Sequence, residues 1–340
     1  MMAEALSAPA LCAEQVRLNA DLMQATGKRL RALMPSFAAT LGRGSSDQAA
    51  AFAKFLLETR AAVPTLSQSP SVGSLYHATS PNFRDTPLIA ISQSGRSPDL
   101  LAAAQDAIDC DAALIAVVND TASPLADLAQ IVIPVHAGEE TSVAATKSFI
   151  GTLIAITHLV AEWSEDAELL TALSDIGPVL ERAAMADWTP AVPLLRGASE
   201  MLVLGRGPTL PVAGEAALKL KETSSLHAEA LSSAEVAHGP MTLVGTGDPV
   251  LVLGPLDVAR TGLRERIEDF AGRGANVIAA GLPEDVAAAR LVLPMQTDLH
   301  PAIAAIAQIQ SFYGLANALS LARGCNPDSP PHLNKVTRTL

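Results

Sequence analysis

The chain has 340 residues, of which 49% are hydrophobic and 17% charged, and its formal net charge is −12. This length usually holds two domains, and the composition is typical of a globular α/β protein with buried parallel strands. The negative charge argues against a general affinity for nucleic acid or for an anionic membrane surface, so any anionic ligand must be held by a local site.

Neither the N-terminus nor the cysteines indicate export. The first residues lack a basic region followed by a long apolar run, which argues against a secretory signal. The longest apolar run, residues 149–160, is interrupted by polar residues and is shorter than the roughly 20 residues that span a bilayer, so it predicts a buried helix. Cys12, Cys110 and Cys325 share no metal-type spacing and fit reduced thiols. We therefore expect a cytoplasmic protein and assign the cysteines no function.

In chain order, a helical lead-in over residues 1–34 precedes two copies of one structural unit. The motif Leu-Gly-Arg-Gly stands at 41–44 and again at 204–207, each time between a strand and a helix. In both copies there follow a second strand (87–91; 249–253), a helix (98–108; 259–272), a third strand (113–118; 275–280) and a fourth (131–135; 291–295). This alternation predicts two doubly wound, flavodoxin-like α/β halves, each with a parallel sheet. We place the first domain at 35–164, a helical linker at 165–195, the second domain at 196–322 and an extended tail at 323–340.

A serine-rich loop, residues 92–97, follows the strand at 87–91 and precedes a helix that Pro98 would open. Ser97 has a structural interpretation as the N-cap of this helix. Hydroxyls and a glycine at the positive end of a helix, where a parallel strand ends, are also typical of phosphate sites. The equivalent loop of the second half, 254–257, has no serine, and this asymmetry favours a phosphate site in the first half. The turn at 42–46 would converge with the loop on one crevice.

The densest ionisable chemistry lies in residues 214–240. Glu215, Lys219 and Glu222 stand at i, i+4 and i+7, so they share one face of a predicted helix. Residues 224–240 are interpreted as a polar loop. Taken alone, this stretch favours a solvated helix face over proton-transfer chemistry, because charged residues are mostly exposed. Residues 139–148 are interpreted as a helix N-terminus with acidic residues that suit the helix dipole.

Several of these segments together resemble a known family. The motifs are Ser-Gln-Ser-Gly at 92–95, Val-Ala-Ala-Thr-Lys at 143–147, Ala-Leu-Lys-Leu-Lys-Glu at 217–222, His-Ala-Glu at 227–229, His-Gly-Pro at 238–240 and Leu-Asn-Lys at 333–335. In this order they resemble the isomerase half of glutamine:fructose-6-phosphate amidotransferase, a tandem pair of sugar isomerase (SIS) domains. The glutaminase half of that family is expected to be missing, as in the stand-alone SIS-type glucosamine-6-phosphate deaminases.

The resemblance implies a role for particular residues. Glu222 would be the base that moves a proton between C1 and C2 of the sugar, with Lys219 and Glu215 behind it. His238, from the neighbouring subunit of a homodimer, would assist ring opening, and Lys335 would lie at the carbonyl end of the substrate. The remaining positions implied in binding the sugar phosphate are Ser45, Ser46, Ser92, Gln93, Ser94, Ser97, Val143 and Ala145. Ala145 stands where the family has a serine and Ser97 where it has a threonine; the first change leaves the identity of the sugar open.

The resemblance therefore implies conversion of glucosamine-6-phosphate and water to fructose-6-phosphate and ammonia, with no metal or redox cofactor. An aldose–ketose isomerase or a deglycase acting on another phosphorylated amino sugar or fructosamine is an alternative, as is a non-catalytic sugar-phosphate sensor. The equivalent helix of the first half carries Lys54 and Glu58, so a glutamate is not catalytic by its place in the helix alone. The segment 227–240 and Lys335 favour catalysis.

Overall fold

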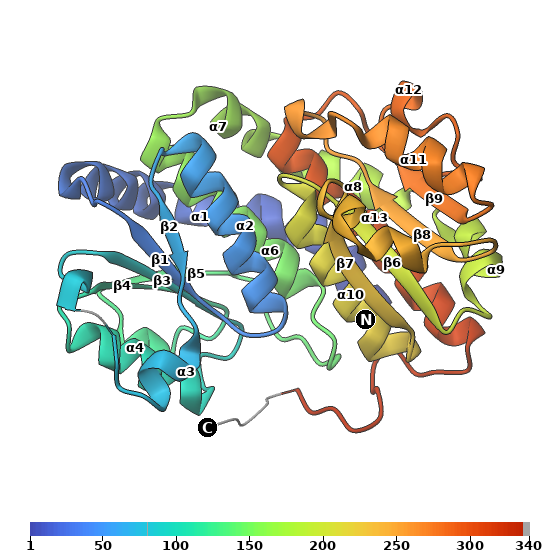
Figure 1. Cartoon of the computed structure of the whole chain (residues 1–340). Helices are drawn as coiled ribbons and strands as arrows, with labels where there is room; N and C mark the ends of the chain where they lie inside the picture. The colour runs from blue at the N-terminus through green and yellow to red at the C-terminus, as the bar shows by residue number, and fades with distance from the viewer. Residues whose placement is uncertain (80, 336–340) are drawn as a thin grey trace. The chain divides into compact units, whose positions relative to one another are not determined.

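The computed structural model describes residues 1–79 and 81–335, which form two compact units. The first unit comprises Ser7–Glu140, Lys147–Gly177 and the tail from Leu333; the second comprises Met1–Leu6, Thr141–Thr146 and Pro178–His332. The chain therefore passes between the units more than once. Figure 1 shows that each unit has its own sheet with helices against it.

The first unit is built around a parallel sheet. Within the described residues its strand order is β2-β1-β3-β4-β5, so the chain starts at β1, steps to one edge and then runs to the other. This is the doubly wound order of flavodoxin-like folds. The elements are α1 (Met2–Leu33), β1 (Ala38–Leu41), α2 (Ser45–Arg60), β2 (Thr65–Ser67), α3 (Pro70–Ser74), a 3₁₀ turn (Pro81–Phe83), β3 (Pro87–Ser92), α4 (Pro98–Ile108), β4 (Ala113–Val118), α5 (Pro124–Leu128), β5 (Ile131–Pro134), α6 (Lys147–Ser164) and α7 (Ala167–Ser174).

The second unit repeats this arrangement. Its strand order, β7-β6-β8-β9-β10, corresponds strand by strand to that of the first unit within the part of the chain described. Its elements are α8 (Ile176–Met185), a 3₁₀ turn (Thr189–Ala191), α9 (Val192–Leu195), β6 (Glu200–Gly205), α10 (Thr209–Ser224), β7 (His227–Ser232), η3 (Glu235–His238), η4 (Pro240–Leu243), β8 (Pro249–Leu253), η5 (Val258–Arg260), α11 (Leu263–Gly272), β9 (Asn276–Ala280), α12 (Pro283–Val286), β10 (Leu291–Val292) and α13 (Pro301–Ala322).

The central strands are buried on both faces, which explains their nearly continuous apolar sequences. In β3, for example, Leu88 and Ala90 belong to the core cluster that includes α4. Ile89 and Ile91 are equally buried although they do not belong to that cluster. Because successive side chains point to opposite faces of a strand, β3 is covered by side chains on both sides. The sheet therefore lies between two helical layers.

The duplicated Leu-Gly-Arg-Gly motif forms the same turn in both units. A Cβ on Gly42 would stand 2.6 Å from the carbonyl oxygen of Ser46, and one on Gly205 would stand 2.3 Å from that of Thr209. Gly44 and Gly207 have φ values of 57° and 58°, in the left-handed region that favours glycine. The first glycine of each motif is therefore required by close packing and the second by backbone conformation.

The predicted fold class is confirmed, with one correction. The sequence predicted four strands per half, whereas each sheet has a fifth, formed by β2 and β7. Residues 227–232 were predicted to belong to a polar loop, and they instead form β7, which pairs in parallel with β6. Both missed strands lie at a sheet edge, where half of the side chains face outward and the apolar signal is weak.

Two helices are predominantly apolar and buried. The prediction of a buried helix over 149–160 is confirmed, because nearly every residue of α6 is buried. Among the described helices, α13 is long and apolar enough to cross a membrane, but 83% of its apolar window is buried inside the structure. Length and apolar composition of this kind are shared by the core helices of globular proteins.

Candidate functional site

In the first unit, the two predicted phosphate loops lie side by side. Loop 42–46 follows β1 and loop 92–97 follows β3, and these strands are neighbours in the sheet, with Leu41 opposite Ala90. Arg43 of loop 42–46 also contacts the helix that follows loop 92–97: its Nε donates a hydrogen bond to Oδ2 of Asp99, in the first turn of α4, at 2.9 Å. The two loops are therefore neighbours in this unit, and a shared crevice between them stays a prediction.

The serines of these loops occupy the N-terminal ends of two helices. Ser45 and Ser46 are the first residues of α2, and Ser94 lies in the loop before α4. Ser92 ends β3, and its hydroxyl accepts a hydrogen bond from the backbone N–H of Gly95 at 3.0 Å. The carbonyl of Gln93 accepts the backbone N–H groups of Asn119 and Asp120 at 3.2 and 3.3 Å. The loop is thus held by the Ser92 hydroxyl and by the backbone that follows β4.

The predicted N-cap position of Ser97 is confirmed, although its side chain does not take part in capping. Ser97 occupies the N-cap position of α4, but its side chain makes no capping hydrogen bond to the helix. By contrast, the hydroxyl of Ser123 caps α5 by accepting a hydrogen bond from the N–H of Ala126. Loop 92–97 therefore presents a hydroxyl at the start of α4 that capping does not engage.

In the second unit, α10 carries the row of acid, base and acid. Lys219 contacts Glu215 at 3.5 Å between Nζ and Oε1, and also donates a hydrogen bond to Glu222. The side chains of Glu215 and Lys219 are 0% and 1% exposed, and that of Glu222 is 23% exposed. The solvated helix face favoured by the sequence alone is therefore wrong. Only Glu222 reaches solvent, at the end of a buried charged row.

The surroundings of α10 explain why this row is buried. The helix packs against β6, β7 and α13, and α13 also holds its C-terminal end. Ser320 donates a hydrogen bond to the carbonyl of Thr223 at 2.6 Å, and Arg323 donates one to the carbonyl of Ser224 at 2.7 Å. These bonds satisfy carbonyls that a helix end otherwise leaves without partners.

The equivalent helix of the first unit shows that such a row need not be buried. In α2, Lys54 pairs with Glu58, and the two side chains are 41% and 39% exposed. The α2 pair is the ordinary surface ion pair of a helix. The two equivalent helices therefore differ in that Lys219 of α10 is buried and Lys54 of α2 is exposed.

His238 lies in η3, the 3₁₀ turn that follows β7, and is exposed. Gly239, directly after it, has φ 141° and ψ −54°, and this turn leads into η4. The histidine therefore stands on a surface turn of the second unit.

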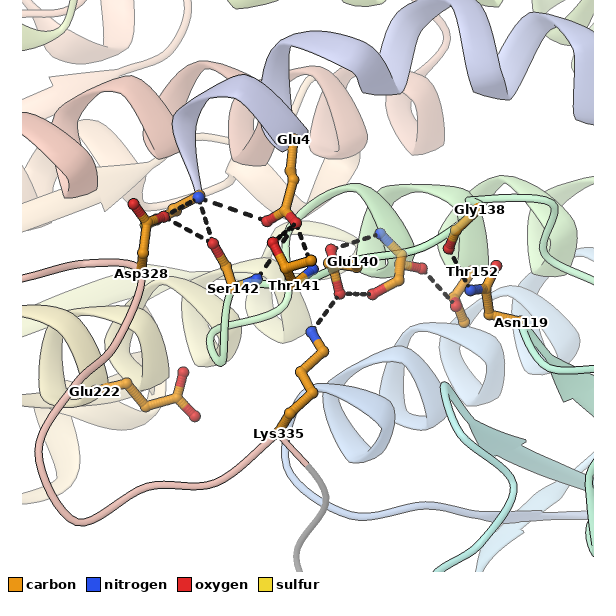
Figure 2. A network of polar contacts seen from close by, with 12 residues as sticks. Glu4, Asn119, Gly138, Glu140, Thr141, Ser142, Thr152, Glu222, Asp328 and Lys335 are labelled. Carbon is orange, nitrogen blue, oxygen red and sulfur yellow. Dashed lines mark hydrogen bonds and ion pairs between the residues drawn. The ribbon is translucent and has the colours of Figure 1, made fainter.

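Segment 139–148 contains a residue that the sequence analysis did not assign. The side chain of Glu140 is 0% exposed, and it accepts hydrogen bonds from the backbone N–H of Ser148 at 3.2 Å and from its hydroxyl at 2.6 Å. Glu140 also contacts the ammonium of Lys335 at 2.9 Å (Figure 2). The predicted helix N-terminus with an acidic residue is confirmed, and the same carboxylate binds the predicted tail lysine.

Residues 141–146 belong to the second unit, where Asp328 holds them. Its backbone carbonyl accepts the N–H of Val143 at 3.2 Å, and its carboxylate accepts the hydroxyl of Ser142 at 2.8 Å (Figure 2). Ala145 is partly exposed in this segment. Val143 and Ala145 thus lie in a different unit from the serine loops.

Comparison with known proteins agrees with this architecture. The SIS domain profile matches residues 38–162 and 194–307, one segment around each sheet. The chain belongs to the SIS domain family. Glutamine–fructose-6-phosphate aminotransferase (isomerizing) from Thermococcus kodakarensis is 34% identical over 261 residues, which cover 74% of this chain and 43% of that protein. The chain spans about half the length of the curated relatives it matches.

Solved SIS structures resemble the chain over nearly its whole length. A candidate phosphosugar isomerase from Silicibacter pomeroyi has a TM-score of 0.89 and 37% identity, covering 96% of this chain and 99% of that one. Glucosamine-6-phosphate deaminase from Thermotoga maritima has a TM-score of 0.78 and 20% identity, covering 99% and 98%. At 20% identity, the similarity to the Thermotoga maritima deaminase shows a shared fold.

The buried row on α10 predicts a large difference between two matched variants. Lys219→Met removes the ammonium beside two carboxylates, one of them fully buried, and should lower the free energy of unfolding by about 3–5 kcal/mol. Lys54→Met, at the equivalent surface pair, should lower it by about 1 kcal/mol or less. Urea unfolding followed by circular dichroism measures both. Equal, small effects would contradict the importance of the buried row.

The Glu140–Lys335 contact predicts protection of the tail from trypsin, which cleaves after lysine. The lysine must leave Glu140 to enter the protease, so Glu140→Gln should speed cleavage after Lys335 about tenfold. Glu139→Gln, at the exposed neighbouring position, is the matched control and should leave the rate unchanged. Mass spectrometry of timed digests gives the rates. Equal rates in the two variants would show that Glu140 does not hold the lysine.

Proposed function

We propose that this SIS chain converts glucosamine-6-phosphate and water to fructose-6-phosphate and ammonia. The observation that carries the proposal is the row on α10, in which Glu222 is the solvent-reaching end of a buried set of charges. A carboxylate that must take and return a carbon-bound proton needs a fixed position and access to the substrate. Membership of the SIS family and the likeness to aminotransferases that act on fructose-6-phosphate support a sugar-phosphate substrate.

In the proposed reaction, His238 assists opening of the sugar ring. Glu222 then takes the proton from C2 and returns it to C1, while a proton passes from the C2 amine to the C1 carbonyl oxygen, which leaves a hydroxyl group at C1 and an imine at C2. Water adds to the imine carbon, and loss of ammonia gives the ketone of fructose-6-phosphate. General acid–base catalysis of this type contributes roughly a hundred- to ten-thousand-fold to a rate. Lys219 holds Glu222, and Lys335 acts at the carbonyl end of the open sugar.

The serine loops of the first unit are proposed to bind the phosphate group. Their hydroxyls lie at the starts of α2 and α4, where backbone N–H groups and the helix dipole favour an anion. The hydroxyl of Ser97, which capping does not engage, supports this role. The second unit keeps the glycine turn but has no serine in residues 254–257.

Aldose–ketose isomerisation of a hexose phosphate is a second candidate. The Silicibacter pomeroyi protein, 37% identical to this chain, is named as a candidate phosphosugar isomerase. The proton transfer by Glu222 is the same in both reactions; only the substituent at C2 differs, an amine in the deaminase and a hydroxyl in the isomerase. Ala145 stands where the family carries a serine, and this change leaves open whether the sugar carries an amine or a hydroxyl at C2.

The decisive assay supplies glucosamine-6-phosphate and measures both ammonia and fructose-6-phosphate. The native chain should form them in equal amounts, and Glu222→Gln should reduce turnover at least a hundredfold, because an amide cannot accept the proton. Glu58→Gln, on the equivalent helix of the first unit, is the matched control and should keep full activity. Reverse assays with fructose-6-phosphate and ammonia test the direction of the reaction.

Two results would overturn parts of this proposal. If neither product forms while glucose-6-phosphate or another hexose phosphate is isomerised, the deaminase assignment is wrong and the isomerase stands. If Glu222→Gln keeps full activity on the true substrate, the assigned base is wrong.

We further propose a homodimer in which His238 serves the site of the neighbouring subunit. Its exposed position on a turn supports this role. Chains carrying Glu222→Gln and chains carrying His238→Ala should each be inactive, and refolded mixtures should recover about a quarter of native activity if one intact site forms in each mixed dimer. Recovery is measured by ammonia release. Mixed dimers without recovered activity would show that each subunit supplies its own histidine.

A further inference from the structure

Arg43 of loop 42–46 forms an ion pair with Asp99, in the first turn of α4. Nε and one Nη nitrogen of Arg43 each lie 2.9 Å from Oδ2 of Asp99. The aspartate side chain is 1% exposed, whereas that of the arginine is 53% exposed. The other carboxylate oxygen of Asp99, Oδ1, accepts the backbone N–H of Leu100 at 2.9 Å. The helix thus fixes the carboxylate, and the carboxylate fixes the guanidinium.

This arrangement leaves donor capacity on the arginine. A guanidinium carries five N–H donors in a planar fork, and the contact with a single oxygen of Asp99 uses only part of them. More than half of the side chain faces solvent, beside the first turn of α2 with Ser45 and Ser46. The buried carboxylate therefore orients a cation whose remaining donors are accessible to solvent close to Ser45 and Ser46.

The internal repeat shows that the fold does not require this ion pair. Arg206 occupies the equivalent position in the second Leu-Gly-Arg-Gly motif, within a turn of the same conformation. It donates a hydrogen bond to the backbone carbonyl of Thr261 at 2.9 Å rather than to a carboxylate. The second unit also lacks serines in the loop after β8. The glycine turn with its arginine is therefore present in both units, whereas the buried acid paired with that arginine is found in the unit that has the serines.

We propose that Arg43 binds the phosphate group of the substrate directly and that Asp99 is its positioning residue. This inference rests on the proposed phosphate site of the first unit and adds its cation. Hydroxyls and backbone N–H groups alone would leave a phosphate dianion without a compensating charge in a chain of net charge −12. Arginine matches phosphate geometry with paired hydrogen bonds, and a fixed guanidinium loses less conformational freedom on binding.

Calorimetric titration with fructose-6-phosphate tests this role without depending on turnover. Arg43→Met should raise the Kd about tenfold to a hundredfold, because a hydrogen-bonded charge is lost, and Arg43→Lys should restore part of the affinity. Asp99→Asn should raise the Kd by about fivefold although Arg43 is still present. In assays of turnover, all three variants should raise KM and leave kcat within about twofold, as expected for groups that bind a remote phosphate.

Two matched controls accompany these variants. Arg206→Met removes the repeat counterpart, and Arg96→Met removes the exposed arginine of loop 92–97, which pairs with Asp120 at 2.7 Å. Both should bind fructose-6-phosphate within about twofold of the native chain. An equal loss of affinity in either control would overturn the assignment to Arg43.

The double variant Arg43→Met/Asp99→Asn separates binding from folding, because it removes the cation together with the buried charge that the cation neutralises. It should melt near the native temperature and still bind fructose-6-phosphate at least tenfold more weakly. Native affinity in the double variant would show that Arg43 only neutralises Asp99, and would overturn the inference. A native chain that binds fructose-6-phosphate but releases no ammonia would overturn the deaminase proposal alone, and one that binds no sugar phosphate would overturn this inference as well.

Discussion

The position of Glu222 in the second unit depends on the burial of one ammonium group, that of Lys219. Removing a charged group from water costs several kcal/mol unless opposite charges lie close to it. Glu215 and Glu222 supply those charges from the same helix, and the packing of β6, β7 and α13 around α10 keeps water away. The position of Glu222 is therefore tied to a lysine that cannot move without exposing a buried carboxylate. A carboxylate held in this way is suited to proton transfer, because its geometry does not have to be restored in each cycle.

Much of the fold could be predicted from the sequence, because the signals that specify it are local and repeated. The strands β4 and β8 and the helix α4 begin and end at the predicted residues. Strand β2 was missed because it has three residues, two of them exposed. Strand β7 was missed because its histidine and glutamate suggested a loop, although exposed His227, buried Ala228 and exposed Glu229 alternate with the period of a strand. That alternation was the available signal.

The site was less predictable, because burial and long-range pairing decide it. The spacing of Glu215, Lys219 and Glu222 placed them on one helix face, but whether that face is solvated depends on elements far away in the sequence. The contact of Glu140 with Lys335 joins residues 195 positions apart, and that of Arg43 with Asp99 joins residues 56 positions apart. No local pattern identifies such partners. Family resemblance named Lys335 but not the buried acid that holds it.

The two repeats share one backbone arrangement but differ in the chemistry that we propose for them, and this difference has a physical reason. Binding a phosphate uses backbone N–H groups, hydroxyls and an accessible cation at the ends of helices, all of which work at a partly exposed surface. Moving a carbon-bound proton instead requires a carboxylate fixed by buried neighbours. The burial that fixes a carboxylate would exclude a hydrated dianion, so the two needs are met at separate places. The serine hydroxyls lie at the starts of α2 and α4, near the oriented Arg43, whereas Glu222 lies in the last turn of α10, whose ion pair is buried where that of α2 is exposed. The asymmetry between the copies is therefore more informative about function than their similarity, which reports the fold they share.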